Sequence, residues 1–467
     1  MQLNGIHSGK NRIIISSAIY VLVLLFCFAA TAAPTNPVIK ESDRFDTIPE
    51  ILRFTQEESG RININDHFFA RHLLPHTVTE SLNDELGSRL LKMEEKAIEI
   101  LTPLSGAKSE TELDTGAMIF RTGRKIMSFE LISSGMVGSN QVYVDMDALV
   151  YDMETGMRIM ADDLFEPDSM GWNIVENKVK EQLTGYFPDM EADPEKLDML
   201  SSREHLTKVP FLMTAGRLIF CFRADELYAD RQTLMYAEIY YPEINEYLNE
   251  EIRSQTDNTC YRLAAITFDD GPAASSSNLL INKLMKYGVA ATFFNVGTGA
   301  DRNRGAVCRE HDLCFDVGSH NYIHDTRIGV QDAANGMKQM DELYSELFGL
   351  RPVLFRAPGG NFKNFIAAGN DRPMIKWSVI GGDAEDKSDG EIILMLSGRT
   401  NAGDIVLMHD LANRSSMFVE EAMPTLEQRN VMCVTVRELC SIYGLELNSE
   451  DIVISCEEQV LKIINAE

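Results

Sequence analysis

From Tyr261 onward the chain repeats one order of elements, and this order limits the possible folds. Short apolar runs alternate with amphipathic helical segments: residues 263–268 precede a helix at 278–287, which Gly288 closes, and an apolar run at 289–296 follows. Such alternation predicts a parallel sheet with helical crossovers. About 185 residues are too few for eight full repeats, so we expect an α/β domain with a distorted, reduced (β/α) barrel. The alternation continues through residues 314–317, 331–348, 353–355, 374–380, 391–396, 405–408, 419–427, 431–434 and 436–443.

The first half of the chain has a different pattern. A helical stretch at residues 82–101 is mixed with alternating segments at 141–151 and 218–223, which is typical of an α+β domain. The composition turns polar at residues 256–259. We therefore predict a separate α+β domain over residues 51–250, the barrel domain over 258–446 and a C-terminal extension over 447–467. A fragment that starts near Asp257 is expected to fold alone.

The amino terminus indicates export. Lys10 and Arg12 precede a run without charge from residue 13 to 33, which closes with the small-x-small sequence Ala30-Thr31-Ala32. Residues 1–33 are thus predicted to be a signal peptide, or a membrane anchor, because residues 13–33 are also long enough to span a bilayer. Residues 34–50 are polar and contain proline, as in a linker. The remainder is expected to be extracytoplasmic, either secreted or anchored at the cell envelope.

Composition and charge exclude some partners and chemistries. The formal net charge is −28 at pH 7, whereas nucleic-acid binding needs a concentrated basic face, so we expect no nucleic-acid partner. Eight cysteines, of which Cys27 lies in the amino-terminal run, leave seven, and none of these pairs has CxxC spacing. An odd number leaves at least one thiol free or intermolecular. Cys308 and Cys314 are close enough to form a small disulfide loop, or both are unpaired.

Polar residues follow five of the predicted strands, at the point where each strand ends. In a barrel of parallel strands these ends form one face, so we expect the polar side chains to meet there. The residues are Asp269, Asp270, His320, His324, Arg356, Asp383, His409 and Asp410.

Together these residues fit a hydrolytic metal site. His320 and His324 are four positions apart, which places two imidazoles on one side of a helical turn, and one carboxylate completes a three-ligand site with open positions. Of the adjacent Asp269 and Asp270, one can bind the cation while the other accepts a proton from water. His409 can then protonate a departing amine. The histidine pair alone and the aspartate pair alone are weak evidence for a site, since core packing or a solvated turn also explains them. Here both pairs occur together at strand ends.

The segment from Tyr261 to about Gly444 resembles the polysaccharide deacetylase family, also called the NodB homology domain or carbohydrate esterase family 4. Two stretches of the first half, residues 150–165 and 216–244, resemble an accessory domain of unknown function that precedes some bacterial members. The five family motifs appear in order as TFDDG at 267–271, SHNYIH at 319–324, RAPGG at 356–360, WSVIGGDA at 377–384 and IVLMHD at 405–410.

The resemblance assigns a role to each catalytic and metal-binding position. It implies that Asp269 is the general base, that His409 is the general acid, and that Asp270, His320 and His324 bind a divalent cation. The expected cation is Zn²⁺, with Co²⁺ or Mn²⁺ as alternatives.

Further positions of the motifs imply supporting roles. Arg356 and Asp383 would orient the catalytic carboxylate and imidazole, and backbone N–H groups near Gly359 and Gly360 would help to hold an oxyanion. The chain departs from the commonest pattern in two places. Gly359 stands where the third motif often has an aromatic residue, and the fourth motif, which often reads Asp-x-x-Asp-Trp, has Ile380, Asp383 and Ala384. These changes remove apolar walls of the groove and leave the proton and metal groups in place.

The resemblance implies a carbohydrate N-deacetylase, a hydrolase of linear amide bonds, that acts on an acetylated amino-sugar polymer. Peptidoglycan is the first candidate substrate, because the chain is predicted to be exported and to carry the accessory domain. Chitooligosaccharide or exopolysaccharide deacetylation and O-acetyl ester hydrolysis are alternatives, and a non-catalytic wall-binding protein is a third. The complete set of acidic residues and histidines argues against the last. The accessory domain is expected to be either a spacer or a wall-binding module.

Overall fold

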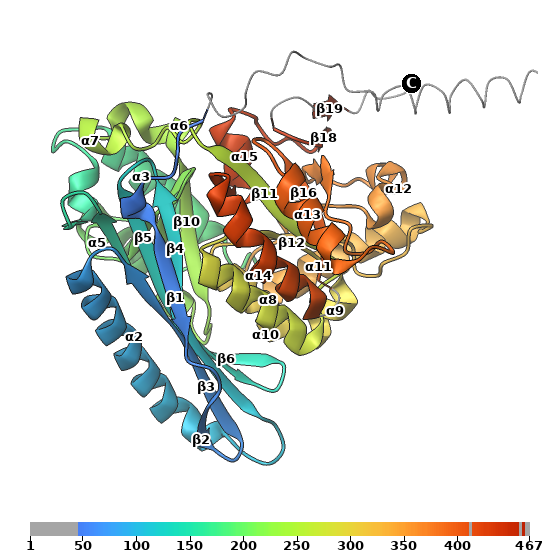
Figure 1. Ribbon diagram of the computed structural model, residues 1–467, viewed down its shortest axis with the longest axis horizontal. Helices are drawn as coiled ribbons and strands as arrows, with labels where there is room; N and C mark the ends of the chain where they lie inside the picture. Colours follow the sequence, from blue (N-terminus) through green and yellow to red (C-terminus); the bar gives the residue numbers. More distant parts are fainter. Residues whose placement is uncertain (1–44, 411–412, 457–459, 463–467) are drawn as a thin grey trace, which may run out of the picture. The chain divides into compact units, whose positions relative to one another are not determined.

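The computed structural model describes residues 45–410, 413–456 and 460–462 (Figure 1). The predicted signal or anchor and most of the linker lie outside these residues. Among the helices that the structure describes, none is long and apolar enough to cross a membrane. Residues Asp46–Glu467 form one compact unit.

The first half is built on a seven-stranded, mostly antiparallel sheet in the order β1-β3-β4-β5-β6-β7, with β2 paired to β3. Helix α2 (Glu80–Leu101) packs on it through leucines at a four-residue spacing, Leu82, Leu86 and Leu90, which place one apolar stripe on the sheet. The strands are β1 (Phe54–Glu58), β2 (Ile62–Asn65), β3 (Phe68–Thr77), β4 (Thr111–Thr122), β5 (Ile126–Val137), β6 (Asn140–Asp152) and β7 (Met157–Ile159).

A second, three-stranded antiparallel sheet follows in the order β10-β9-β8 and packs against helix α3. Both predicted alternating segments, residues 141–151 and 218–223, are strands, and the predicted helix at 82–101 is α2. The elements are α3 (Gly171–Gly185), α4 (Pro194–Leu200), α5 (Arg203–Leu206), β8 (Phe211–Met213), β9 (Arg217–Arg223), β10 (Leu234–Tyr240), α6 (Tyr241–Ile244) and α7 (Glu250–Arg253).

The second half is a distorted, reduced barrel, as predicted. Parallel strands lie in the order β13-β12-β11-β16-β15, and β17 pairs with the first residues of β11. Isolated parallel bridges join Ser319 to Phe355 and Phe355 to Met374, and these bridges connect β13 to β14. The strands are β11 (Arg262–Asp269), β12 (Thr292–Asn295), β13 (Asp316–Ser319), β14 (Met374–Ile375), β15 (Val379–Ile380), β16 (Ile405–His409) and β17 (Val431–Val434).

Two predicted strands of the barrel differ from expectation. The segment at residues 353–355 forms only the bridge at Phe355, and the segment at 374–380 is divided into β14 and β15. At the division, the carbonyl oxygens of Ile375 and Lys376 accept hydrogen bonds from the guanidinium of Arg356.

Each barrel helix that the sequence predicts is present, although α8 begins at residue 274 and α14 at residue 413, both earlier than expected. Gly288 and Gly349 end α8 and α11 with φ of 59° and 82°, which glycine adopts without strain. Helices α9 and α10, between β12 and β13, and helix α12 are additions to the prediction. The helices are α8 (Ala274–Tyr287), α9 (Gly297–Arg302), α10 (Arg304–Asp312), α11 (Val330–Phe348), α12 (Lys363–Ala367), α13 (Asp389–Arg399), α14 (Asn413–Gln428) and α15 (Val436–Ile442).

The predicted C-terminal extension adds to the barrel sheet. Strand β18 (Asp451–Val453) pairs in parallel with β14 and in antiparallel with β19 (Val460–Lys462). Cys308 and Cys314, the pair that could have formed a small loop, are both buried free thiols.

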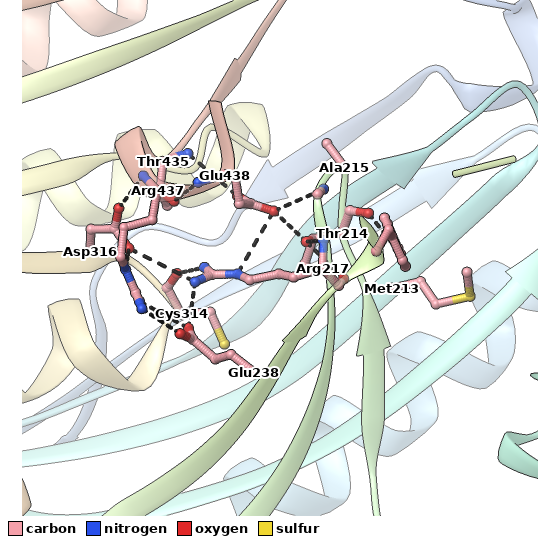
Figure 2. Close-up of polar contacts among 12 residues, drawn as sticks. Met213, Thr214, Ala215, Arg217, Glu238, Cys314, Asp316, Thr435, Arg437 and Glu438 are labelled. Carbon is pink, nitrogen blue, oxygen red and sulfur yellow. Dashed lines mark hydrogen bonds and ion pairs between the residues drawn. The ribbon is translucent and has the colours of Figure 1, made fainter. Parts of the chain in front are cut away.

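A buried network of charges joins the two halves of Asp46–Glu467 (Figure 2). Arg217 of β9 is fully buried; its Nη2 donates to the carbonyl oxygen of Cys314 (2.8 Å), and its Nη1 pairs with Glu238 of β10. Arg437 of α15 donates from Nε to Asp316 of β13 (2.8 Å) and pairs through Nη1 with Glu238 (2.7 Å). Both guanidinium groups therefore depend on partners from both halves.

A second buried network also joins the two halves. Arg309 of α10 is buried, lies 3.3 Å from Asp114 of β4, and donates to the side-chain oxygens of Asn278 (2.8 Å) and Asn282 (2.7 Å). The largest cluster of buried apolar side chains also combines residues of both halves, such as Phe120 and Phe293. Independent folding of residues 51–250 and 258–446 stays a prediction, and these contacts weigh against it.

We expect a fragment that begins at Asp257 to be less stable than the full chain, because it exposes apolar side chains such as Phe293 that the first half helps to bury. It also removes the contacts of Arg309 with Asp114 and of Asp316 with Arg217. Exposing apolar surface costs about 25 cal/mol per Å². Thermal unfolding and size-exclusion chromatography would show a lower melting temperature or aggregation. A chain that begins at Asp46 is the control and should unfold as the full chain does. A soluble fragment with an unchanged melting temperature would contradict the account and restore the expectation of independent folding.

Candidate metal centre and active site

Seven polar side chains meet at the carboxyl ends of the barrel strands, where the sequence places them. Asp269 ends β11 and lies opposite His409, the last residue of β16, in the parallel register. His320 follows β13 directly. The remaining members of the group are Asp270, His324, Arg356 and Asp383.

Asp270, His320 and His324 form a cluster that fits a divalent cation. Their ligand atoms lie within 4.8 Å of one another. One carboxylate oxygen, Asp270 Oδ1, is 3.4 Å from His320 Nε2 and 3.3 Å from His324 Nε2. That oxygen is buried and has no hydrogen-bond donor among the described residues, which is the state of a ligand atom whose partner is a cation. One carboxylate and two imidazoles are typical ligands of zinc, and they also suit other divalent transition metals.

The surroundings prepare these residues to bind a cation. His320 Nδ1 donates to the carbonyl oxygen of Arg356 (2.8 Å), which leaves Nε2 as the unprotonated atom that faces Asp270. Burial opposes ionisation of Asp270, but the imidazoles of His320, His324 and His409 outweigh it and hold the pKa of that carboxyl below its ordinary value. The carboxylate is therefore available at neutral pH.

Asp269 lies beside the cluster and is held by Arg356. Arg356 Nη1 donates to Asp269 Oδ1 (2.7 Å) and to the hydroxyl of Thr267 (2.7 Å), while both residues of the pair are buried. The other oxygen, Asp269 Oδ2, is 3.7 Å from His320 Nε2. Arg356 thus fixes one oxygen of Asp269 and leaves the other directed toward the metal cluster.

His409 is oriented in the same way by Asp383. Asp383 accepts from the ring Nδ1 of His409 (3.0 Å) and from its backbone N–H (2.7 Å), so ring Nε2 is the free atom. Burial alone would lower the pKa of His409, but Asp383, Asp269 and Asp270 outweigh it and raise the pKa above its ordinary value.

Residues 256–371 match the family described as polysaccharide deacetylase. A peptidoglycan-N-acetylglucosamine deacetylase of Bacillus cereus is 30% identical over 193 residues, which cover 38% of this chain and 88% of that protein.

The chain belongs to the polysaccharide deacetylase family.

Two longer relatives match the same half of the chain. The peptidoglycan-N-acetylglucosamine deacetylase PgdA of Listeria monocytogenes is 30% identical over 185 residues, and the peptidoglycan-N-acetylmuramic acid deacetylase PdaC of Bacillus subtilis is 26% identical over 189 residues. The matched regions cover 39% and 40% of this chain, and the same shares of the two relatives. The solved structure of PdaC is 26% identical, covers 39% of this chain and 92% of that one, and has a TM-score of 0.37.

The third motif of this family member differs from expectation in one respect. The N–H of Gly360 donates to the carbonyl oxygen of Ala357 (2.8 Å), so it is not free for an oxyanion. Gly359 has φ of 65°, and a Cβ there would lie 2.9 Å from a side-chain carbon of Thr326. The positive φ and this close approach both disfavour a side chain at position 359.

Asp410 is a site residue to which the sequence reasoning gave no role. Its N–H donates to the carbonyl oxygen of Asp269 (2.8 Å), and its carboxyl accepts from Ser277 Oγ. Burial raises the pKa of Asp410 to about 6. The only signal in the sequence is its position after His409 at a strand end.

The geometry predicts that Asp383→Asn lowers the pKa of His409, because it removes the carboxylate that favours the imidazolium. Histidine NMR titration of metal-free protein measures this directly, and Asp389→Asn, an exposed residue paired with Arg414, is the control.

The same substitution should lower stability in a defined pH range. The folded pKa lies above the unfolded value of about 6.5. The contribution of the pair is therefore fully present below that value and is lost as pH rises through the folded pKa. An unchanged His409 titration in Asp383→Asn would show that Asp383 does not control this imidazole.

Proposed function

We propose that the protein is a metal-dependent hydrolase that removes N-acetyl groups from the amino sugars of a cell-envelope polysaccharide, with peptidoglycan as the first candidate. The observation that carries the proposal is the meeting of Asp270, His320 and His324 with a held carboxylate, Asp269, and a held imidazole, His409, on one face of the barrel. Family membership and the printed names of the relatives support the substrate class.

In this proposal Asp270, His320 and His324 hold one divalent cation, with Zn²⁺ first and Co²⁺ or Mn²⁺ as alternatives. When bound, the cation would supply Lewis-acid chemistry, which makes water more acidic and polarises the acetamide carbonyl. The orphaned carboxylate oxygen of Asp270 supports this set of ligands.

Asp269 acts as the general base. Its Oδ1 accepts a hydrogen bond from Arg356, which orients the carboxylate, while Oδ2 accepts the proton of the attacking water. Arg356 is itself held in place, because it is buried and bonded to two carbonyl oxygens. It therefore holds the carboxylate of Asp269 in one orientation.

His409 acts as the general acid. Asp383 fixes Nδ1 as the donor to the carboxylate, so the imidazolium releases its proton from Nε2 to the nitrogen of the departing amine. The raised pKa of His409 supports this role, since a larger share of the imidazole is protonated near neutral pH. Acetate and a free amino sugar are the products.

Exposed apolar side chains beside the site support a carbohydrate substrate. Ile323, between the two histidine ligands, is 56% exposed, and Ile380, shortly before Asp383, is 44% exposed. Such side chains suit the apolar face of a sugar ring. The amino-terminal sequence supports an extracytoplasmic location, whether secreted or membrane-anchored, where an envelope polysaccharide is accessible.

The test compares wild type, Asp269→Asn and Asp270→Asn on peptidoglycan fragments, chitooligomers and acetylated xylan with added zinc, with products measured by mass spectrometry. We expect wild type to remove acetyl groups from an amino sugar. Asp269→Asn should keep its metal yet lose turnover by about a hundredfold to ten-thousandfold, since it lacks only the base. Asp270→Asn is the matched variant that should lose metal and activity together.

Three outcomes would contradict the proposal. Near-normal turnover by Asp269→Asn would remove the assigned base. Acetate release from xylan alone would make the protein an esterase. No release from any substrate by metal-loaded wild type would favour a binding protein.

A further inference from the structure

Two cysteines outside the catalytic and metal-binding group lie against each other. The sulfur atoms of Cys440 and Cys456 are 3.3 Å apart, and the residues are 16 positions apart in the sequence. Cys440 lies on α15 and is fully buried, whereas Cys456, shortly after β18, is partly exposed. Neither belongs to the five family motifs.

Separate contacts hold the backbone at each cysteine. Helix α15 begins with a capping box between Thr435 and Glu438, and the carbonyl oxygen of Cys440 accepts from the N–H of Leu445 (2.8 Å). The N–H of Cys456 donates to the carbonyl oxygen of Gly403 (2.9 Å), beside a bridge between Asp404 and Ser455. The two thiols are thus presented to each other by elements that are already in place, and a bond of roughly 2.05 Å requires only a small approach.

We propose that Cys440 and Cys456 form a disulfide in the mature protein, which fastens β18 to the catalytic barrel. The proposal rests on the extracytoplasmic location in the proposed function, because disulfides persist in oxidising compartments. It makes the C-terminal strand a covalently held part of the active-site domain.

The oxidation needs an external disulfide, such as that of a thiol–disulfide oxidoreductase. The more exposed Cys456 attacks the oxidant as a thiolate, forms a mixed disulfide and displaces one sulfur of the oxidant. Cys440 then loses its proton and attacks the Cys456 sulfur, which releases the second sulfur. The two cysteines together lose two electrons and two protons, and the oxidant gains them as two thiols. The hydrogen bond to Cys456 and burial keep the pKa of Cys440 well above its ordinary value, which makes Cys456 the first nucleophile.

The bond would support the catalytic base through two intermediate contacts. Strand β18 pairs with β14, and the N–H of Lys376 donates to the carbonyl oxygen of Val453 (2.7 Å). The carbonyl oxygens of Ile375 and Lys376 in turn accept from Arg356, which holds Asp269. A loose β18 would therefore disturb the acceptors that fix the guanidinium.

Peptide mapping of protein secreted from an oxidising compartment tests the bond. Free thiols are alkylated first, and the peptides are compared with and without reductant. We expect one linked peptide pair that joins Cys440 to Cys456. Alkylation of both thiols without reduction, or a bond to a different cysteine, would overturn the proposal.

Thermal unfolding gives an independent measurement. Reductant should lower the melting temperature of wild type by roughly 5 °C, as expected for closing a loop of this length. Cys456→Ser should melt at the reduced value and not respond to reductant, whereas Cys260→Ser, whose thiol has no cysteine neighbour among the described contacts, should behave as wild type. Equal responses of Cys456→Ser and wild type would contradict the proposal.

The mapping does not depend on turnover, so the two proposals can fail separately. A linked pair in a protein without deacetylase activity would remove only the proposed function. Free thiols in an active secreted enzyme would remove only the disulfide.

Discussion

The buried pair of Arg356 and Asp269 is the interaction on which the active site depends. The guanidinium has no exposed surface, and its hydrogen bonds reach Asp269, Thr267 and two carbonyl oxygens at the end of β14, those of Ile375 and Lys376. The carbonyl oxygen of the same residue fixes the tautomer of His320. One arginine therefore orients the proposed base and a proposed metal ligand at once, and it is itself bonded to the backbone where β14 ends.

The contacts of the first half suggest a different role from the one that sequence pattern indicates. A wall-binding module or spacer would be joined to the barrel by a small polar interface, since relative motion is the default for such domains. Here Arg217 is completely buried beside Asp316, which begins the short strand that leads to His320. We infer that residues from about 46 to 250 support the barrel, whatever else they bind.

The parts of the fold that are buried through apolar side chains could be predicted from the sequence. The run at 263–268 is buried on both faces as β11, and the polar residues at strand ends do converge. Helix α10 was missed because its buried side chains include Arg309, Glu310 and Asp312, which a periodicity argument assigns to solvent. Some of their partners, such as Asp114 for Arg309 and Gln141 for Asp312, come from the first half and cannot be paired from the local sequence. The segment around Phe355 was predicted to be a full strand because its residues are apolar. These residues pack without extending the ladder, so only the bridge at Phe355 forms.

The central claim is that the three-residue cluster holds a catalytic cation, and anomalous diffraction from crystals grown with zinc tests it most directly. The account predicts one strong peak about 2.0–2.2 Å from a carboxylate oxygen of Asp270 and the Nε2 atoms of His320 and His324. The peak should vanish in His320→Ala and persist in His76→Ala, an exposed histidine near Glu57. A peak at another place, or equal occupancy in His320→Ala, would contradict the account.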